Sequence, residues 1–115
     1  PKIISKLTEI LGPWQVSGPA LTIGAEAFSD PQWADETRER LALDSDRLDR
    51  LLTANGAEVV GGTTLFRLYQ VDDAKAAQDH LAKHHVWSRI FPYADNWLRL
   101  GLPAPDRWDQ LESAF

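Results

Sequence analysis

Cysteine is absent from the sequence, which excludes a disulfide scaffold, a thiolate metal site and a cysteine nucleophile. The absence fits the cytosol, so we expect a cytoplasmic protein. No apolar run approaches the roughly 18 residues that a membrane-spanning helix needs, and we expect no membrane contact. Positive charge is also scarce: the sequence has 17 acidic residues but only 12 Lys and Arg, which gives a net charge of −5. A nucleic-acid partner is therefore not expected.

Methionine is absent too, and the chain begins at Pro1. Such a start suggests an excised or processed segment, although removal of an initiator methionine would look the same. The 115 residues fit one domain of ordinary size with a real core. We expect a single domain over 1–115, with connecting and packing helices in 1–55 and a ββαββα core in 56–115.

Three helices are expected in the first half of the chain. Residues 3–11 show the apolar spacing of a short helix, which Gly12-Pro13 would end. Ser17 is a candidate N-cap for a second helix rich in small residues. A third helix is expected over 31–55, where Pro31 occupies the first turn and many Asp, Glu and Arg residues form a solvated face.

Strands dominate the second half. Residues 57–71 predict a strand, a turn at Gly61-Gly62 and a second strand. Asp72 is expected to cap a helix, and Asp106 is expected to cap a final one. With two further strands at 86–91 and 97–102, the order is α+β: a three- to four-stranded sheet with helices packed on one face.

Arg99 stands out because it lies in an apolar strand, WLRLGL. Alternation places the three leucines on one face and Arg99 on the other, beside Trp97 and Gly101. Since the leucines belong against the helices, Arg99 should face a cleft or a partner.

Arg89 has a similar place in VWSRIF, where it shares a face with Trp87 and Phe91. A guanidinium held on a strand is a good fork for a carboxylate or a phosphate. Two alternatives remain open, an internal ion pair to one of the acids and simple exposure of the charged end to water.

Other candidate sites are weaker. His80 and His84 have a spacing that can hold a metal, but no third ligand is evident, so no metal site is expected. The stretch Gly61–Thr64 is rich in glycine, yet it precedes a strand, whereas a phosphate loop precedes a helix. No arrangement of nucleophile, base and orienting acid can be identified.

Four segments in order, PWQVSGPAL, VVGGTTLFRL, VWSRIF and WLRLGLP, resemble the C-terminal part of pyridoxal-phosphate enzymes of the aspartate aminotransferase fold. Within that superfamily the chain is most similar to the CobC-type branch of cobalamin biosynthesis, which is threonine-phosphate decarboxylase-like. The resemblance covers essentially all of the chain and implies the small C-terminal domain of fold-type I enzymes.

The resemblance implies roles for both arginines. Arg99 matches the family's arginine that grips the substrate α-carboxylate, and Arg89 matches the one that reaches the phosphate of phosphorylated amino acids. The implied partners are such a substrate and a missing N-terminal domain that binds pyridoxal phosphate, in a parent homodimer. A histidinol-phosphate-type aminotransferase is an alternative.

The family's Schiff-base lysine lies in a motif that this sequence lacks, and Lys6 is not expected to replace it. We therefore expect no catalytic or cofactor-binding residue in this chain, no bound cofactor and no activity of the chain alone. A stand-alone α+β module that binds a small molecule is the alternative from another class.

Overall fold

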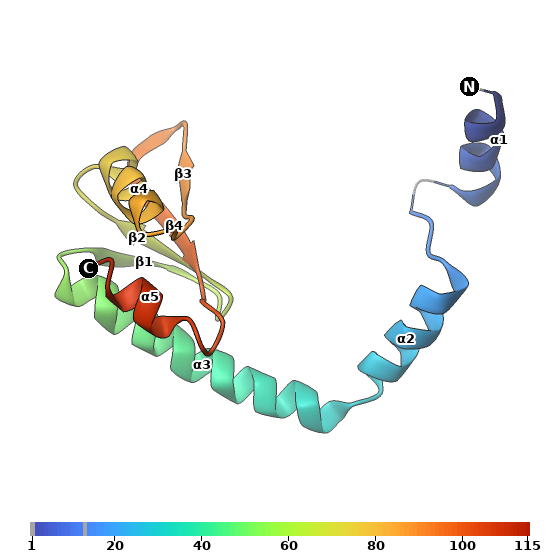
Figure 1. Cartoon of the computed structure of the whole chain (residues 1–115), viewed down its shortest axis with the longest axis horizontal. Helices are drawn as coiled ribbons and strands as arrows, with labels where there is room; N and C mark the ends of the chain where they lie inside the picture. The colour runs from blue at the N-terminus through green and yellow to red at the C-terminus, as the bar shows by residue number, and fades with distance from the viewer. Residues whose placement is uncertain (1, 13) are drawn as a thin grey trace. The chain divides into compact units, whose positions relative to one another are not determined.

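A computed structural model describes residues 2–12 and 14–115. The chain forms two compact units, residues 1–35 and 36–115, which are described separately. Among the described residues, five helices and four strands follow one another along the chain (Figure 1). In the same residues, no helix is long and apolar enough to cross a membrane.

The first unit holds α1 (Lys2–Leu11), α2 (Gly18–Phe28) and the start of α3 (Pro31–Ala54). The three helices lie where the sequence predicts them. Ser17 caps α2 as expected, since its side chain accepts a hydrogen bond from the Ala20 N–H. Gly12 has a φ of 75°, a left-handed conformation that ends α1. The expected stop at Pro13 and the start at Pro1 lie outside the described residues.

The second unit is built on a four-stranded antiparallel sheet in the order β1-β2-β4-β3. β1 (Glu58–Gly62) and β2 (Phe66–Gln70) form a hairpin. α4 (Ala74–Lys83) then leads to β3 (Arg89–Phe91) and β4 (Ala94–Gly101). α5 (Trp108–Glu112) follows. The α+β class, the four strands and the ββαββα order agree with the sequence-based prediction.

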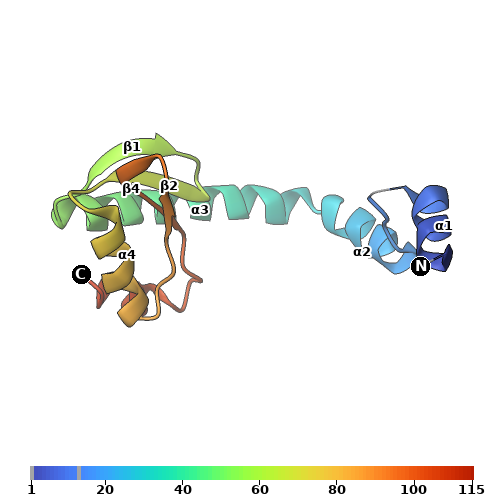
Figure 2. The same ribbon diagram turned by 90° about the horizontal axis from the view of Figure 1, so that it is seen from above.

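One face of the sheet carries the core. Leu98 and Leu100 on β4 are 1% and 2% exposed. They belong to a cluster of buried residues from α3, α4 and α5, which include Leu48, Leu52, Leu81, Trp108 and Leu111. Figure 1 shows α5 beside α3, and Figure 2 shows α4 beneath the strands. The alternation of WLRLGL thus separates the core from an open face, as expected.

Arg47 links α5 to α3. Its guanidinium donates to Glu112 at 2.8 Å, and its Cζ lies 4.3 Å from the centroid of the Trp108 ring. α5 has only five residues and no side-chain hydrogen bond at its N-cap, Arg107. The predicted cap at Asp106 is therefore wrong, and packing of Trp108 and Leu111 replaces it as the stabilising contact.

The turn prediction at Gly61-Gly62 is also wrong. Both glycines belong to β1, where the register shifts between Val59 and Gly61, and the turn comes at residues 63–65. Their φ values of 149° and 141° are open to glycine without strain, so the pair forms an irregular strand end instead of a two-residue turn.

Three smaller differences concern element ends. The strand predicted over 86–91 begins only at Arg89, where β3 starts. The cap of α4 is Asp73 and not Asp72, because the Asp73 side chain accepts from the Ala76 N–H at 2.9 Å. β4 begins at Ala94, three residues before the predicted start, because Ala94 already pairs with Phe91 of β3.

Candidate anion-binding site

The open face of the sheet brings Arg89 and Arg99 together. The two residues are direct partners in the register of β3 and β4, and Leu68 of β2 faces Arg99 from the other side. Residues directly opposite in an antiparallel pair share a face and lie about 5 Å apart at Cβ. The structure therefore places both predicted arginines at one site, with Arg89 exposed and Arg99 half-buried.

A groove of about 560 Å³ contains both arginines. Its lining comes from β2, α4, β3 with the segment before it, and β4: Phe66, Gln78, Trp87, Ser88, Arg89, Ile90, Arg99 and Gly101. The lining includes two cations and no carboxylate, so its charge suits an anionic ligand.

Neither arginine has an acidic partner within residues 2–12 and 14–115. Each lies over an aromatic ring instead. Arg99 Cζ is 4.6 Å from the centroid of the Phe66 ring, and Arg89 Cζ is 5.5 Å from that of Phe91. Stacking on a ring face leaves the N–H groups at the guanidinium edge available for a ligand.

Among the described residues of this sheet, Arg67, and neither Arg89 nor Arg99, forms an internal ion pair. Arg67 Nε donates to Asp49 Oδ1 at 2.9 Å, its Nη2 bonds Oδ2, and the Tyr69 hydroxyl donates to Oδ1 at 2.7 Å. Arg67 faces Leu100 in the register, so it lies on the covered side of the sheet, opposite Arg99.

This network shifts three pKa values. Burial raises the pKa of Asp49, but the hydrogen bonds from Arg67 and Tyr69 outweigh it and hold the pKa below its ordinary value. The bond to Asp49 raises the pKa of Arg67. Burial, followed by the bond to Asp49, strongly raises the pKa of Tyr69. The charge of Arg67 is therefore balanced by an ion pair with Asp49. Arg89 and Arg99 have no such acidic partner within the described part of the chain.

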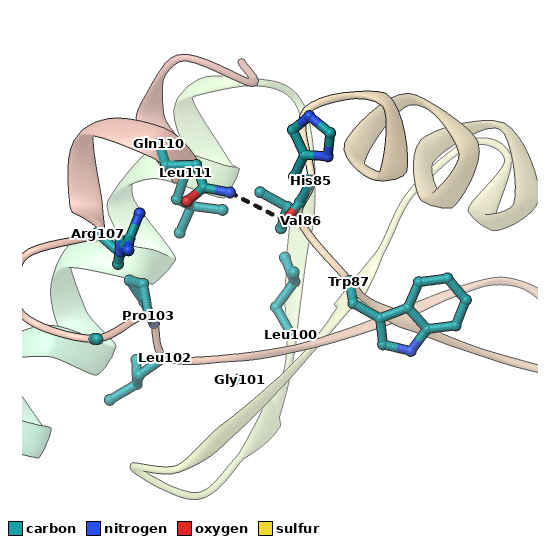
Figure 3. A pocket seen from close by; sticks show the side chains of 11 residues that line it. His85, Val86, Trp87, Leu100, Gly101, Leu102, Pro103, Arg107, Gln110 and Leu111 are labelled. Carbon is teal, nitrogen blue, oxygen red and sulfur yellow. Dashed lines mark hydrogen bonds between the residues drawn. The ribbon is translucent and has the colours of Figure 1, made fainter.

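The segment before β3 positions Arg89. His85 has a left-handed φ of 60°, and the Val86 N–H donates to the Leu81 carbonyl, which closes the end of α4. Gln110 Nε2 holds the same segment, with donor distances of 3.3 Å to the His84 carbonyl and 3.1 Å to the His85 carbonyl. Figure 3 shows that Gln110 points toward His85.

A second cavity, of about 320 Å³, lies between this segment, the end of β4 and α5. Trp87 lines both cavities and is 81% exposed. In Figure 3 its indole lies away from Arg107 and Gln110, which occupy the other end of this cavity. Trp87 is therefore a rim residue of the arginine groove.

The histidines make other contacts. His80 Nε2 lies 2.8 Å from the Ala114 carbonyl, and its ring centroid is 5.0 Å from that of His84. Across the described ranges, no group of three or more His, Cys, Asp or Glu is placed to hold a metal ion.

The chain belongs to the class I and II aminotransferase family, whose model matches residues 1–113. It is 37% identical over 114 residues to threonine-phosphate decarboxylase of Pseudomonas aeruginosa, a match that covers 98% of the chain and 34% of that protein. It is 39% identical over 107 residues to threonine-phosphate decarboxylase of Sinorhizobium sp, which covers 90% of the chain and 30% of that protein. The chain thus spans about a third of the length of these curated relatives.

The residues that line the groove do not fit pyridoxal phosphate. A Schiff base to its aldehyde needs an amine, and no lysine lines the groove. Lys75 on α4, the helix that contributes Gln78 to the groove, bonds Asp79. What the groove offers is two guanidinium groups, which match the anionic ends of a ligand and not the reactive end of this cofactor.

Proposed function

We propose that this chain is the C-terminal part of a pyridoxal-phosphate-dependent, threonine-phosphate decarboxylase-like enzyme of cobalamin biosynthesis. In this proposal the chain supplies the residues that bind the anionic substrate, and a domain outside the chain binds the cofactor. The whole enzyme would be a cytoplasmic homodimer. The observation that carries the proposal is the pairing of Arg89 with Arg99 on the open face, in a groove lined by no acid.

Arg99 binds the α-carboxylate and Arg89 binds the phosphate of one substrate molecule. Arg99 suits a planar carboxylate because it is half-buried and stacked on Phe66, which favours a fixed bidentate contact. Arg89 lies on the edge strand of the sheet and is exposed, so it can reach the more distant phosphate.

Like charges at directly opposite positions of a sheet are destabilising. The chain nevertheless has two arginines at these opposite positions, whereas the neighbouring Arg67 forms an ion pair with Asp49. A ligand with two anionic ends would relieve the repulsion when it binds. Strands hold both guanidinium groups in place, so the bound substrate would be oriented and not merely attracted.

The test is turnover of O-phospho-L-threonine by the full-length protein, with carbon dioxide and the aminopropanol phosphate measured as products. Arg99→Ala should lower kcat/KM roughly 30-fold or more, since truncation of one partner of a buried charged pair costs about 2 kcal/mol at least. Arg89→Ala should also lower kcat/KM, but by less, because Arg89 is exposed. Lys83→Ala removes a positive charge outside the groove and is the matched control.

The proposal fails if both arginine variants retain the kcat/KM of the unaltered enzyme. Transfer of the amino group to an oxo acid, without release of carbon dioxide, would favour the histidinol-phosphate-type aminotransferase alternative instead.

A further inference from the structure

The hairpin turn between β1 and β2 holds Phe66 in a fixed place. The Phe66 carbonyl accepts from the Thr63 N–H at 2.8 Å. The Thr63 hydroxyl oxygen accepts from the N–H groups of Leu65 and Phe66, at 3.2 and 3.3 Å. A Cβ at Gly62 would lie 2.2 Å from the Phe66 carbonyl oxygen, so only glycine permits this close approach. The glycine- and threonine-rich stretch therefore fixes the backbone of Phe66.

The ring of Phe66 extends from this fixed point across β4. Phe66 is the register partner of Gly101, and a Cβ at Gly101 would lie 3.5 Å from the ring, so the ring packs over that glycine. The same ring lies 4.6 Å from Arg99 Cζ. In the part of the chain that the structure describes, Arg99 makes no ion pair with an acid. The ring face is thus the contact that orients this guanidinium.

We infer that Phe66 is a positioning residue for Arg99, and that Gly62 at the end of β1, together with the turn that begins at Thr63, holds Phe66 over Gly101. This inference rests on the proposed function, in which Arg99 binds the substrate carboxylate. Arg89 lies over a different ring, that of Phe91. Phe66 therefore acts on recognition of the carboxylate and not on recognition of the phosphate.

The experiment compares two ligands of the full-length enzyme. O-phospho-L-threonine carries a carboxylate and a phosphate, whereas its decarboxylated product, 1-amino-2-propanol phosphate, carries only the phosphate. Phe66→Leu should raise the KM for O-phospho-L-threonine roughly two- to fivefold, the range expected for one exposed cation–π contact. The inhibition constant of the product should stay unchanged. Phe66→Tyr keeps the ring face and should restore the KM.

Two results would overturn the inference. In one, Phe66→Leu weakens the binding of both ligands equally, which indicates a general loss of packing. In the other, Phe66→Tyr is as impaired as Phe66→Leu, which means that the ring face is not what matters.

Arg99→Ala, measured in parallel, separates the two proposals. If Arg99→Ala weakens binding of O-phospho-L-threonine no more than binding of the product, the role of Arg99 in the proposed function is wrong. If Arg99→Ala discriminates between the ligands and Phe66→Leu does not, only the positioning role of Phe66 is wrong.

Discussion

Arg89 and Arg99 face each other across β3 and β4 with no acid in the lining of their groove. Cross-strand pairs of like charge cost a few tenths of a kcal/mol up to about 1 kcal/mol. The pair is therefore not explained by stability of the sheet, in contrast to Arg67, which is bound by Asp49.

The first prediction concerns this repulsion. Arg89→Gln should leave the free energy of unfolding of the 115-residue chain unchanged or raise it by up to about 1 kcal/mol, because one of two facing charges is removed. Urea unfolding at low salt measures the effect. Lys83→Gln makes the same charge change on α4 and should not stabilise. Marked destabilisation by Arg89→Gln alone would mean that Arg89 has a structural partner.

The second prediction concerns anion binding by the chain alone. Inorganic phosphate should raise the urea midpoint more than chloride does at equal ionic strength, because a ligand that binds only the folded state stabilises it. Arg89→Gln should reduce the difference to the general stabilisation that phosphate gives any folded protein as an excluded anion, and Lys83→Gln should preserve it in full. Equal effects of the two anions on the unaltered chain would show that the groove does not bind phosphate.

The third prediction concerns Asp49. Asp49→Asn should lower the free energy of unfolding by about 1–3 kcal/mol at neutral pH, because Arg67 and Tyr69 lose a charged acceptor on the covered side of the sheet. Tyr69→Phe removes one hydrogen bond and keeps the ion pair, so its effect should be smaller.

This contribution depends on pH with a defined sign. The pKa of Asp49 in the folded chain lies below the ordinary value of 3.8. Stability from the carboxylate is therefore fully present well above pH 3.8 and is lost as the pH falls through the lower folded-state pKa. The difference between the unaltered chain and Asp49→Asn should shrink in acid. A difference that is constant from neutral pH down to about pH 2 would contradict this account.

The fourth prediction concerns two neighbouring glycines. Both have positive φ, but a Cβ at Gly62 would clash with the Phe66 carbonyl, whereas a Cβ at Gly61 would meet no atom within 4 Å. Gly61→Ala should cost about 1–3 kcal/mol from backbone strain alone, and Gly62→Ala should cost more. Thermal unfolding of the two variants compares them. Equal losses would mean that the close approach at Gly62 does not constrain the turn.

Much of the fold could be predicted from local signals. Alternation in WLRLGL identified the buried leucines and the open face of β4, because period-two burial is set by the strand itself. The place of Arg99 followed from the same pattern. The family was identified from short segments, and the match over residues 1–113 confirms it.

Element ends depend on contacts that local patterns do not encode. Asp72 and Asp73 are both good capping residues, and the backbone of Asp73, with φ −142° and ψ 104°, decides which one caps α4. The glycine pair looked like a hairpin turn, but its place in β1 is set by pairing with β2.

Contacts between residues that are distant in the sequence were the part of the site that could not be predicted. Asp49 lies in the charged helix whose Asp, Glu and Arg residues are predicted to be solvated, and its bonds to Arg67 and Tyr69 join residues 18 and 20 positions apart. The contact of Phe66 with Arg99 likewise requires the register of β2 against β4. The division of the chain into domains stays a prediction, as do the substrate roles of Arg89 and Arg99.

The central claim is that the two arginines bind different ends of one substrate. The most direct measurement is inhibition of the full-length enzyme by two half-ligands, L-threonine, which has only the carboxylate, and 1-amino-2-propanol phosphate, which has only the phosphate. Arg99→Ala should weaken inhibition by L-threonine and leave inhibition by the aminopropanol phosphate unchanged. Arg89→Ala should weaken inhibition by the aminopropanol phosphate and leave inhibition by L-threonine unchanged. If each variant weakens both half-ligands to the same extent, the assignment of one arginine to each end is wrong.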